Sequence, residues 1–594
     1  MVTNREIVES AMPRAVARKV WSATYLPALP LTPQDFELSG VLPAVMYMAR
    51  NGNRRGAGTM KATYGAPAAS GRVDLTIESI ARVLSGEDDV LAGFNTPVGQ
   101  IILGDILLTW CLENTNRTEG QKATVARVFP THFFASWVDL PESVAHLRGV
   151  PELVIAALAS QENGEHVERP KGDQTRPTGF PVGVPPSNNP LLRVLGKAVA
   201  TSGNITARTA DRLDEGAAHG LGIDELLMTR LAGKLGAAPL PLQGGVNASK
   251  IPNRRPANPK AVIDLRDDLM RFIRHYDKVP RQTFTELLEC GLVVGLSQLL
   301  LRSARVILHL AATGDALPDL EKAQPWELFV DCSVGRDRTL RWLAEDSMRA
   351  TLKQFEQLPR AMMVFRLLDE IVRVVGADPG AMMREDPDPS RLLEFLAGVH
   401  RGTDDQAFDV QRLSGQYCNL LRSELEGHAE EDPSRVGVAE LLRADGGGTP
   451  VERLAEALCE LMGDRLQRAN YLQVLDSSLG AARRTGLVDR RTVRGQSTTR
   501  SAVMRTPMLD YLVHLHLAPS INGRPPRQLS LRGFLDILRS RHGLCIDAAP
   551  NGTNIPAAEL SRNKALLEGR LRDLGVLVTV NDAEDMKTLR SRHA

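Results

Sequence analysis

The sequence contains few aromatic residues and few cysteines. Phe, Tyr and Trp make up 4% of the 594 residues, so the cores must be built mainly from Leu, Val, Ile, Ala and Met. The six cysteines are scattered without a short-spaced pair, which excludes a zinc ribbon or finger and argues against a secreted disulfide framework. Apolar residues at 43% and charged residues at 24% are ordinary for globular proteins and argue against a fibrous or fully disordered chain.

Signals for secretion and membrane insertion are also missing. The N-terminal stretch MVTNREIVESAMPRAVARKVW is charged throughout and lacks the apolar centre of a signal peptide. Residues 291–301 are the most apolar stretch, and they are far fewer than the roughly 18 residues that a membrane span requires. We therefore expect a protein of the reducing cytoplasm that has no membrane partner.

Nucleotide-binding and metal-binding motifs are absent as well. The chain has no G-x-x-x-x-G-K-[ST] loop, no G-x-G-x-x-G between a strand and a helix, and no H-E-x-x-H pair. A P-loop ATPase is therefore not supported, and we expect neither a cofactor nor a metal site.

Helical periodicity dominates the sequence. Residues 264–276 and 361–375 each predict an amphipathic helix, and residues 284–310 predict two strongly apolar helices. Residues 101–112 predict a buried helix in which Asp105 is the one charge. This carboxylate is a candidate buried functional group, and the alternative is a structural carboxylate paired with a cation. The sequence thus predicts a mainly α, multi-domain protein.

Strand-like runs are few and short, the best being 328–330 and 576–580, and shifts in composition mark the expected boundaries. The predicted units are an N-terminal helical domain (1–160), a Gly- and Pro-rich linker (161–190), a central helical domain (191–430), a helical segment with an Arg-rich stretch (431–505) and a C-terminal winged-helix-like domain (506–594).

The net charge of +1 conceals two oppositely charged parts. Residues 481–594 contain 19 Lys and Arg against 10 Asp and Glu, which leaves 53 of the 72 basic and 61 of the 71 acidic residues in 1–480. The balance is therefore +9 in the last part and −8 in the rest. Overall neutrality does not exclude a polyanionic partner.

Much of the positive charge lies in residues 481–505. The seven arginines of this stretch are Arg483, Arg484, Arg490, Arg491, Arg494, Arg500 and Arg505. Its Gly, Ser and Thr content suits a flexible, solvated segment whose cations neutralise phosphates and release counterions. The alternatives are a solvated charge run or a basic surface that docks on the acidic remainder of the chain.

The end of the chain predicts a helix (529–541), a turn, a second helix (557–574) and a strand. This order resembles the winged-helix module of bacterial DNA-binding proteins. The resemblance implies that exposed residues near the start of the second helix enter a major groove. These residues are Arg562, Asn563 and Lys564. Winged helices also serve as protein docking modules.

Residues 326–343, WELFVDCSVGRDRTLRWL, contain the one catalytic-looking motif. A cysteine, five residues, an arginine and a threonine resemble the phosphate loop of the cysteine-dependent tyrosine phosphatases. The resemblance implies that Cys332 is the thiolate nucleophile, Arg338 the bidentate phosphate clamp and Thr339 an aid to the leaving thiolate.

Two carboxylates depart from that pattern. Asp331 stands where the phosphatases have histidine, and Asp337 adds a second negative charge to the loop, so both disfavour a thiolate. The flanks are also helical, where the phosphatase fold requires a central sheet. The alternative is a strand-to-helix turn in which Asp331 or Ser333 caps the helix.

The first 160 residues and the C-terminal module carry a further resemblance. The segments LGDILLTWCLEN (103–114) and RVFPTHFFASWVDLPESVAHLRGVPELV (127–154) are similar to large helical accessory proteins of multigene bacterial defence islands. Such proteins stand beside helicases, nucleases or methyltransferases. The resemblance implies a cytoplasmic component of an anti-phage or anti-plasmid complex.

The leading hypothesis is a non-enzymatic scaffold or adaptor that binds nucleic acid, by preference DNA, and other subunits such as a helicase or nuclease. Two alternatives stay open. One is a Cys332-dependent phosphatase or phosphate-binding hydrolase, and the other is an assembly factor that binds partner proteins without DNA.

Overall fold

A computed structural model describes most of the chain outside residues 159–256. The described residues are 2–22, 24–51, 58–67, 71, 73–86, 93–108, 111–113, 123–128, 147–158, 257–275, 279, 281–379, 389–445, 447–492, 498–518, 529–579 and 587–592. The predicted linker 161–190 lies outside them.

The described chain is mainly α, as predicted, with short strands in small sheets. The helices are α1 (Asn4–Ala11), α2 (Arg14–Val20), α3 (Leu38–Asn51), α4 (Gly58–Tyr64), α5 (Ile77–Ser85), α6 (Pro97–Leu107), α7 (Val150–Leu158), α11 (Pro259–His275), α12 (Arg281–Thr313), α13 (Asp319–Ala323), α14 (Arg338–Phe355), α15 (Leu358–Val374), α17 (Pro389–Arg401), α18 (Ala407–Gly427), α19 (Ser434–Leu441), α20 (Pro450–Leu461), α21 (Asp464–Ser478), α22 (Thr506–Leu517), α23 (Leu531–His542) and α24 (Ala557–Asp573). The strands are β1 (Ala66–Pro67), β2 (Val73–Asp74), β3 (Cys111–Glu113), β4 (Val125–Val128), β5 (Leu328–Phe329), β6 (Val488–Thr492), β7 (Thr498–Ala502), β8 (Leu529–Ser530), β9 (Leu544–Cys545), β10 (Leu577–Thr579) and β11 (Lys587–Leu589).

Helix α12 is the centre of the main body. It packs against α11, α15, α17, α21 and α22, and its apolar residues are distributed around its whole circumference because it is covered on several sides. Residues 283–313 are long and apolar enough to cross a membrane by composition alone, but 78% of their most apolar window is buried inside the protein. The core of the protein therefore accounts for this apolar run.

The expectation of two helices in residues 284–310 is wrong, since α12 runs through without a break. Its glycines serve close packing. A Cβ on Gly291 would lie 2.6 Å from the Tyr511 hydroxyl of α22, and one on Gly295 would lie 2.2 Å from Leu265 Cδ1 of α11. Both neighbours approach the backbone of α12 because these positions carry no side chain.

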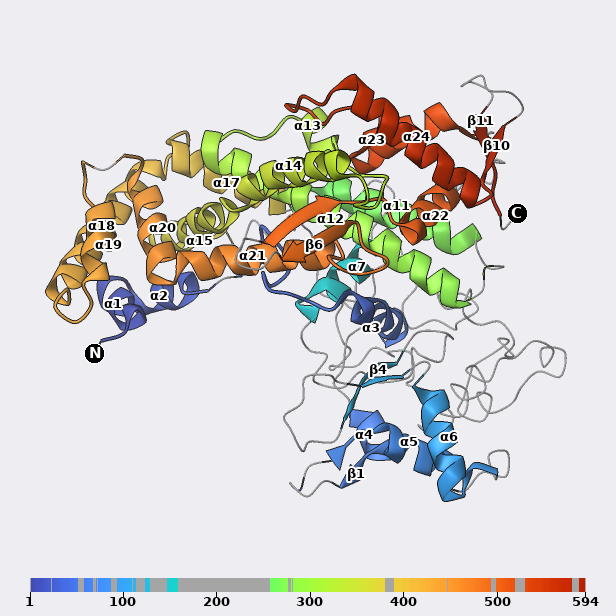
Figure 1. Ribbon diagram of the computed structural model, residues 1–594. Coiled ribbons are helices and arrows are strands. Elements are labelled where there is room, and N and C mark those ends of the chain that lie inside the picture. The colour runs from blue at the N-terminus through green and yellow to red at the C-terminus, as the bar shows by residue number, and fades with distance from the viewer. Residues whose placement is uncertain are drawn as a thin grey trace, which may run out of the picture.

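The main body is elongated (Figure 1). At one end α1 and α2 pack with α15, α18, α19 and α20, although the N-terminal helices are some 400 residues away from α18 and α19 in sequence. At the other end lie α22, α23 and α24, and a smaller lobe with α4, α5 and α6 hangs below the body. Asp105 of α6 is exposed in that lobe, so the prediction that it is buried is wrong.

The Arg-rich stretch is folded on both sides of residues 493–497, which are not described. Strands β6 and β7 pair in antiparallel register, with Arg490 opposite Arg500, and β7 packs on α14. The described part of this stretch is therefore a pair of antiparallel strands and the turns that precede β6, so the prediction of a flexible segment is wrong there.

The C-terminal residues form two helices and a three-stranded antiparallel sheet in the order β10-β11-β8. The predicted helices and final strand are confirmed as α23, α24 and β10, within two residues at each end. Strand β9, between the helices, pairs in parallel with β5 of the central region. One connected apolar core includes Ile7, Val293 and Leu589, so the C-terminal unit is built into the body.

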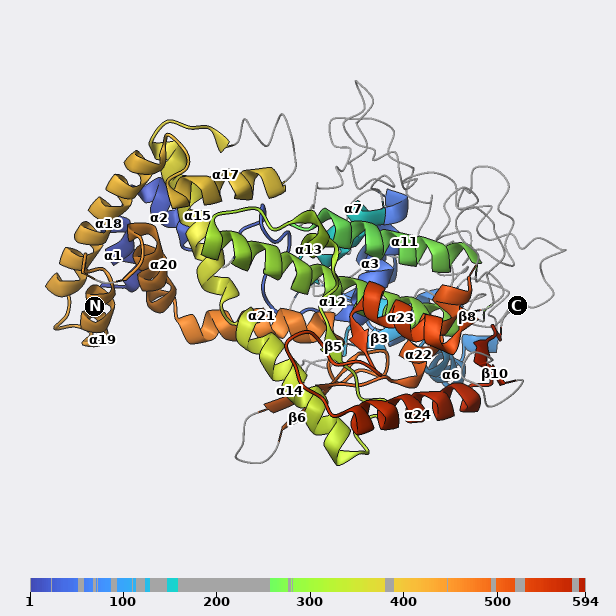
Figure 2. The same cartoon turned by 90° about the horizontal axis from the view of Figure 1, so that it is seen from above.

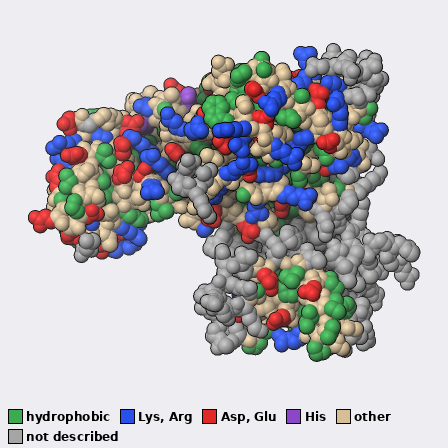
Figure 3. All heavy atoms as spheres, viewed as in Figure 1, with side chains coloured by type: hydrophobic (Ala, Val, Ile, Leu, Met, Phe, Trp, Pro, Cys, Tyr) green, Lys and Arg blue, Asp and Glu red, His purple; other side chains and the backbone are tan. Residues whose placement is uncertain are grey.

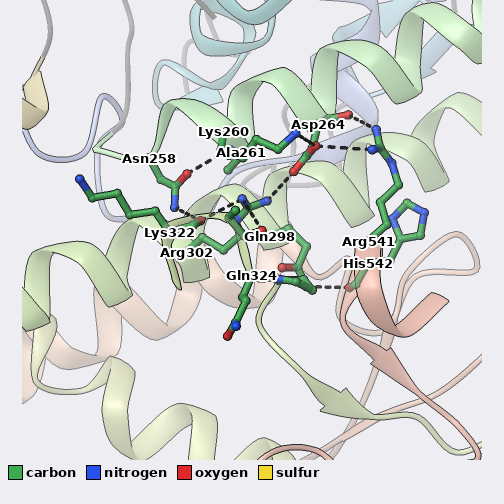
Figure 4. A network of polar contacts seen from close by, with 12 residues as sticks. Asn258, Lys260, Ala261, Asp264, Gln298, Arg302, Lys322, Gln324, Arg541 and His542 are labelled. Atoms are coloured by element: carbon green, nitrogen blue, oxygen red, sulfur yellow. Dashed lines mark hydrogen bonds and ion pairs between the residues drawn. The ribbon is translucent and has the colours of Figure 1, made fainter. Parts of the chain in front are cut away.

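A buried polar network joins α23 to the central helices (Figure 4). Arg302 of α12 binds Asp264 of α11 at 2.7 Å, and Arg541 at the end of α23 binds the same carboxylate at 3.5 Å. The Gln298 side chain of α12 donates to the His542 carbonyl at 2.8 Å. This network fixes the position of α23 on the body.

Candidate functional site

The loop after β5 is the segment on which the candidate site is built. Parallel pairing of β5 with β9 brings the chain to Asp331, whose backbone N–H donates to the Ala502 carbonyl and whose own carbonyl accepts the Met504 N–H. The loop then turns through Val334 and Gly335, both with positive φ, and α14 begins at Arg338. Val334 is a β-branched residue in the left-handed region, where such residues are outliers.

The backbone amides of this loop are bonded to the chain's own carboxylates. The Asp331 carboxylate accepts the N–H groups of Ser333 and Gly335, each at 2.7 Å. Asp337 caps α14 by accepting the N–H groups of Thr339 and Leu340 at 2.9 and 3.1 Å. The Ser333 and Gly335 amides lie in the segment that would cradle a phosphate in a phosphatase loop, and here the Asp331 side chain takes its place.

Cys332 does not have the surroundings of a nucleophile. It is fully buried, and burial raises the pKa of its thiol well above the ordinary value, although the nearby Arg570 acts in the opposite direction. Arg338 and Thr339 are exposed at the start of α14 and do not line the cleft described below. The phosphatase interpretation is therefore wrong, because the thiol is buried and loop amides are already bonded to Asp331. The loop is the strand-to-helix turn that was the alternative, with Asp337 as the helix cap.

Asn563 of α24 anchors the loop from the opposite side. Its Oδ1 accepts the Cys332 N–H at 2.9 Å, and its Nδ2 donates to the carbonyls of Val330 and Ile546 at 2.9 and 3.0 Å. The side chain is fully buried, so the expectation that Asn563 is exposed toward a groove is wrong. Lys564 beside it is half-buried.

A cleft of about 910 Å³ opens between this loop, the turn before β6, the start of α22 and the face of α24. Its charged lining consists of Arg336, Arg484, Arg505, Arg562, Arg570, Asp337 and Asp573. Five cations thus face two carboxylates. We call this feature the arginine cleft.

Two of the arginines form the floor of the arginine cleft. Arg570 donates to the carbonyls of Cys332 and Met504 and to the Thr506 hydroxyl. Arg505 donates to two backbone carbonyls and pairs with Asp489 at 3.2 Å, and its side chain is only 16% exposed. Burial lowers the pKa of both guanidinium groups. Both remain cations at neutral pH, because an arginine pKa starts above 12.

The other three arginines form the rim. Arg484 is 80% exposed and pairs with Glu286 at 2.9 Å, and Arg562 is 56% exposed and pairs with Asp337. Arg336 is exposed and makes no ion pair with any described residue. The Arg484–Glu286 pair is largely exposed and therefore weak, so Arg484 can exchange its partner for the oxygens of a bound anion, and Arg336 is exposed beside it. The Asp337 side chain is only 9% exposed, so its pair holds Arg562 more firmly.

The remaining predicted arginines are largely committed to the chain itself. Arg500 makes a bidentate pair with Asp476 at 2.6 and 2.8 Å, which Arg490 joins at 3.8 Å. Arg483 binds Glu37 and the Ser39 hydroxyl, and Arg491 binds Asp489. Arg494 lies outside the described residues. The basic tail thus docks in part on acidic residues of the body, which is one of the alternatives that the sequence left open.

Positive charge nevertheless dominates this face. Lys and Arg side chains gather across the surface formed by α14, β6 and the C-terminal helices (Figure 3). Seen from above, α14, β6 and α24 lie along the same edge of the molecule (Figure 2). The arginine cleft therefore lies within a wider basic surface.

Sequence reasoning missed Arg336 and Arg570. Arg336 lies inside the motif that drew attention to Cys332, but the family pattern directed attention to Arg338. Arg570 reaches the Cys332 carbonyl across 238 positions of the chain, and no local pattern signals such a contact.

Comparison with known proteins gives one family. The description "Methylation-associated defense system protein MAD7" belongs to the family that matches residues 206–593, which is more than half of the chain and includes every residue of the arginine cleft. The two N-terminal segments that resembled defence-island proteins lie outside the matched residues. No curated protein matches the chain.

Proposed function

The chain belongs to the family of the methylation-associated defense system protein MAD7, and on this premise we propose that it is the subunit that binds nucleic acid through the arginine cleft. Membership makes the chain a component of a defence system, and the expectation of a defence accessory protein is confirmed at that level. The ligand we propose is nucleic acid, its site is the arginine cleft, and the place of action is the cytoplasm, where invading DNA and the other subunits are available.

One observation supports the proposal most strongly. Five arginines from four separate segments of the chain line one cleft, whose described lining includes the carboxylates of Asp337 and Asp573, while Glu286 and Asp489 beside it pair with Arg484 and Arg505. Bringing like charges together costs free energy, and proteins retain such clusters where an anion relieves the repulsion. A guanidinium group donates to phosphate in bidentate fashion, so a row of them suits a sugar–phosphate backbone.

The C-terminal sheet adds support of a second kind. Helix α24 lies next to the arginine cleft, and the β10-β11-β8 order places the β10–β11 pair after it, as a wing follows the recognition helix. Arg562 is the exposed cation at the start of α24. The burial of Asn563 limits any contact of this helix to its outer face, which favours backbone binding over base reading.

The test uses the three rim arginines. Arg336→Gln, Arg484→Gln and Arg562→Gln are combined in one variant, and binding of a fluorescein-labelled oligonucleotide is measured by anisotropy. We expect affinity at low salt to fall roughly 10- to 100-fold. A control variant combines Arg14→Gln, Arg360→Gln and Arg412→Gln, which remove the same charge from exposed ion pairs elsewhere.

Equal affinity of the two variants would reject the cleft as the site. If the parent protein binds no oligonucleotide but still associates with other subunits, the chain is an assembly factor instead. Point substitutions are used because the core includes residues after 480, so removing that part would unfold the body.

A further inference from the structure

An exposed tryptophan lies close to the arginine cleft. Trp342 of α14 is 55% exposed, an unusual state for the largest apolar side chain. Trp326, by contrast, is 8% exposed, donates its indole N–H to the Thr351 hydroxyl and lies beneath the Arg305 guanidinium. Trp326 is thus explained by the fold. Trp342 is not, because most of its ring faces solvent.

The position of Trp342 relates it to the cleft. Asp337 lines the cleft and caps α14, and Trp342 follows five residues later, about 7.5 Å along the helix axis. Arg338 precedes it by one turn and Arg349 follows it by two, and both are exposed on the same face. Asp346 shares this face and pairs with Arg349 at 2.7 Å. The indole therefore lies on an exposed helical face of mixed charge, in the second turn of the helix that follows the cleft-lining loop.

Taking the nucleic-acid proposal as its basis, we propose that Trp342 is a stacking platform and that the ligand is a single strand. Its phosphates would lie on the rim arginines while one unpaired base stacks on the indole. Base–aromatic stacking combined with a positive groove is how proteins hold single strands without sequence preference.

The same geometry disfavours a duplex. Inside a double helix both faces of each base are covered by neighbouring bases, so an indole on the protein surface finds no face to stack on. The cleft volume of about 910 Å³ also falls within the range that accommodates small ligands. A strand of a few nucleotides can enter it, whereas a duplex could contact only its rim.

The test compares three substitutions at Trp342. Trp342→Ala removes the ring, Trp342→Leu keeps an apolar side chain without an aromatic face, and Trp342→Phe keeps a smaller ring. Each is titrated against oligo(dT), oligo(rU) and a blunt DNA duplex of the same length. Phe408→Ala, which removes a 78%-exposed aromatic ring from α18, serves as the matched control. Thermal unfolding verifies that each variant is folded.

We expect Trp342→Ala and Trp342→Leu to weaken single-strand binding about 5- to 100-fold, with Trp342→Phe in between and duplex binding unchanged. Fluorescence quenching by the single strand should be largely lost in Trp342→Phe. The oligo(dT) and oligo(rU) arms decide between DNA and RNA. Unchanged single-strand affinity in folded Trp342→Leu, or an equal loss for duplex, would overturn the stacking proposal. If the rim-arginine variant still loses binding, the proposed function survives that outcome.

Discussion

Asn563 Oδ1 accepts the backbone N–H of Cys332 at 2.9 Å, and 231 positions of the chain separate the two residues. Through this bond and two more to carbonyls, α24 holds the loop that forms one wall of the arginine cleft. The predicted DNA-reading residue is thus an internal anchor, and the predicted nucleophile is its partner.

Removing this anchor should destabilise the protein strongly. Asn563→Ala leaves one N–H and two carbonyl groups buried without partners, so we expect a loss of about 3–5 kcal/mol in the free energy of unfolding. Urea denaturation measures it. Asn551→Ala, at an exposed position, should change the same free energy by less than about 0.5 kcal/mol. A loss below about 1 kcal/mol for Asn563→Ala would mean that the loop is held by other contacts.

The Cys332 thiol should be unreactive in the folded protein. Burial raises its pKa, so little thiolate forms at neutral pH, and the sulfur is also shielded from reagents. Iodoacetamide labelling followed by peptide mass spectrometry should find Cys332 unmodified in native protein and fully modified in denaturant. Rapid native labelling at pH 7, or hydrolysis of an aryl phosphate that Cys332→Ser abolishes, would restore the nucleophile interpretation.

The buried His516–His542 pair should make folding sensitive to mild acid. The two Nε2 atoms lie 2.8 Å apart, an arrangement in which one donates to the other, so both rings cannot be protonated. Burial, and then the neighbouring cations, hold the pKa of His516 well below 6.5 and lower that of His542 to about 3. The unfolded chain takes up these protons below about pH 6.5, so stability is complete above that pH and falls as pH decreases.

For each buried ring, the free energy of unfolding should fall by about 1.4 kcal/mol per unit decrease in pH below about pH 6.5. Asp268 acts in the opposite direction on stability. Burial raises the pKa of its carboxyl to about 6, so as pH falls the folded state binds this proton before the unfolded state does. His542→Gln should therefore lose less stability than the parent between pH 7 and pH 5.5, by roughly 1 kcal/mol, as measured by urea denaturation at each pH. An unchanged pH dependence in His542→Gln would show that the pair is not the source.

Substitutions of glycine should separate close packing from helix propensity. Gly295→Ala places a Cβ 2.2 Å from Leu265 Cδ1, so the Leu265 side chain or α11 must shift, and we expect a loss of about 1–3 kcal/mol in the free energy of unfolding. Gly415→Ala, inside α18 with open space around it, should stabilise the protein by about 0.5–1 kcal/mol. Thermal or urea unfolding measures both. A stabilising Gly295→Ala would show that α11 is not in close contact with α12.

The helices were predictable because their signal is local. The periodicity of residues 264–276 and 361–375 corresponds to α11 and α15, which start a few residues earlier. The pairing of β6 with β7 could not be predicted, because the Gly, Ser and Thr content of this stretch is typical of a flexible segment. The strands are held by contacts with α14 and Asp476. The composition of the tail was informative about charge, but not about which arginines are neutralised within the fold.

The arginine cleft could not be predicted from the sequence for a similar reason. Its walls come from positions near 336, 484, 505 and 570, and only the tertiary fold brings them together. The Cys332 motif directed attention to the right loop for the wrong chemistry. Two carboxylates decided the outcome, since Asp331 occupies loop amides that a phosphate would need and Asp337 caps the helix that follows.

The salt dependence of oligonucleotide binding tests the central claim most directly. For the parent and the rim-arginine variant, the logarithm of the association constant is plotted against the logarithm of the salt concentration. If Arg336, Arg484 and Arg562 each neutralise a phosphate, the variant's slope should be smaller by about 2–3, while the control variant keeps the parent slope. Identical slopes for the parent and the rim-arginine variant would contradict phosphate binding in the arginine cleft.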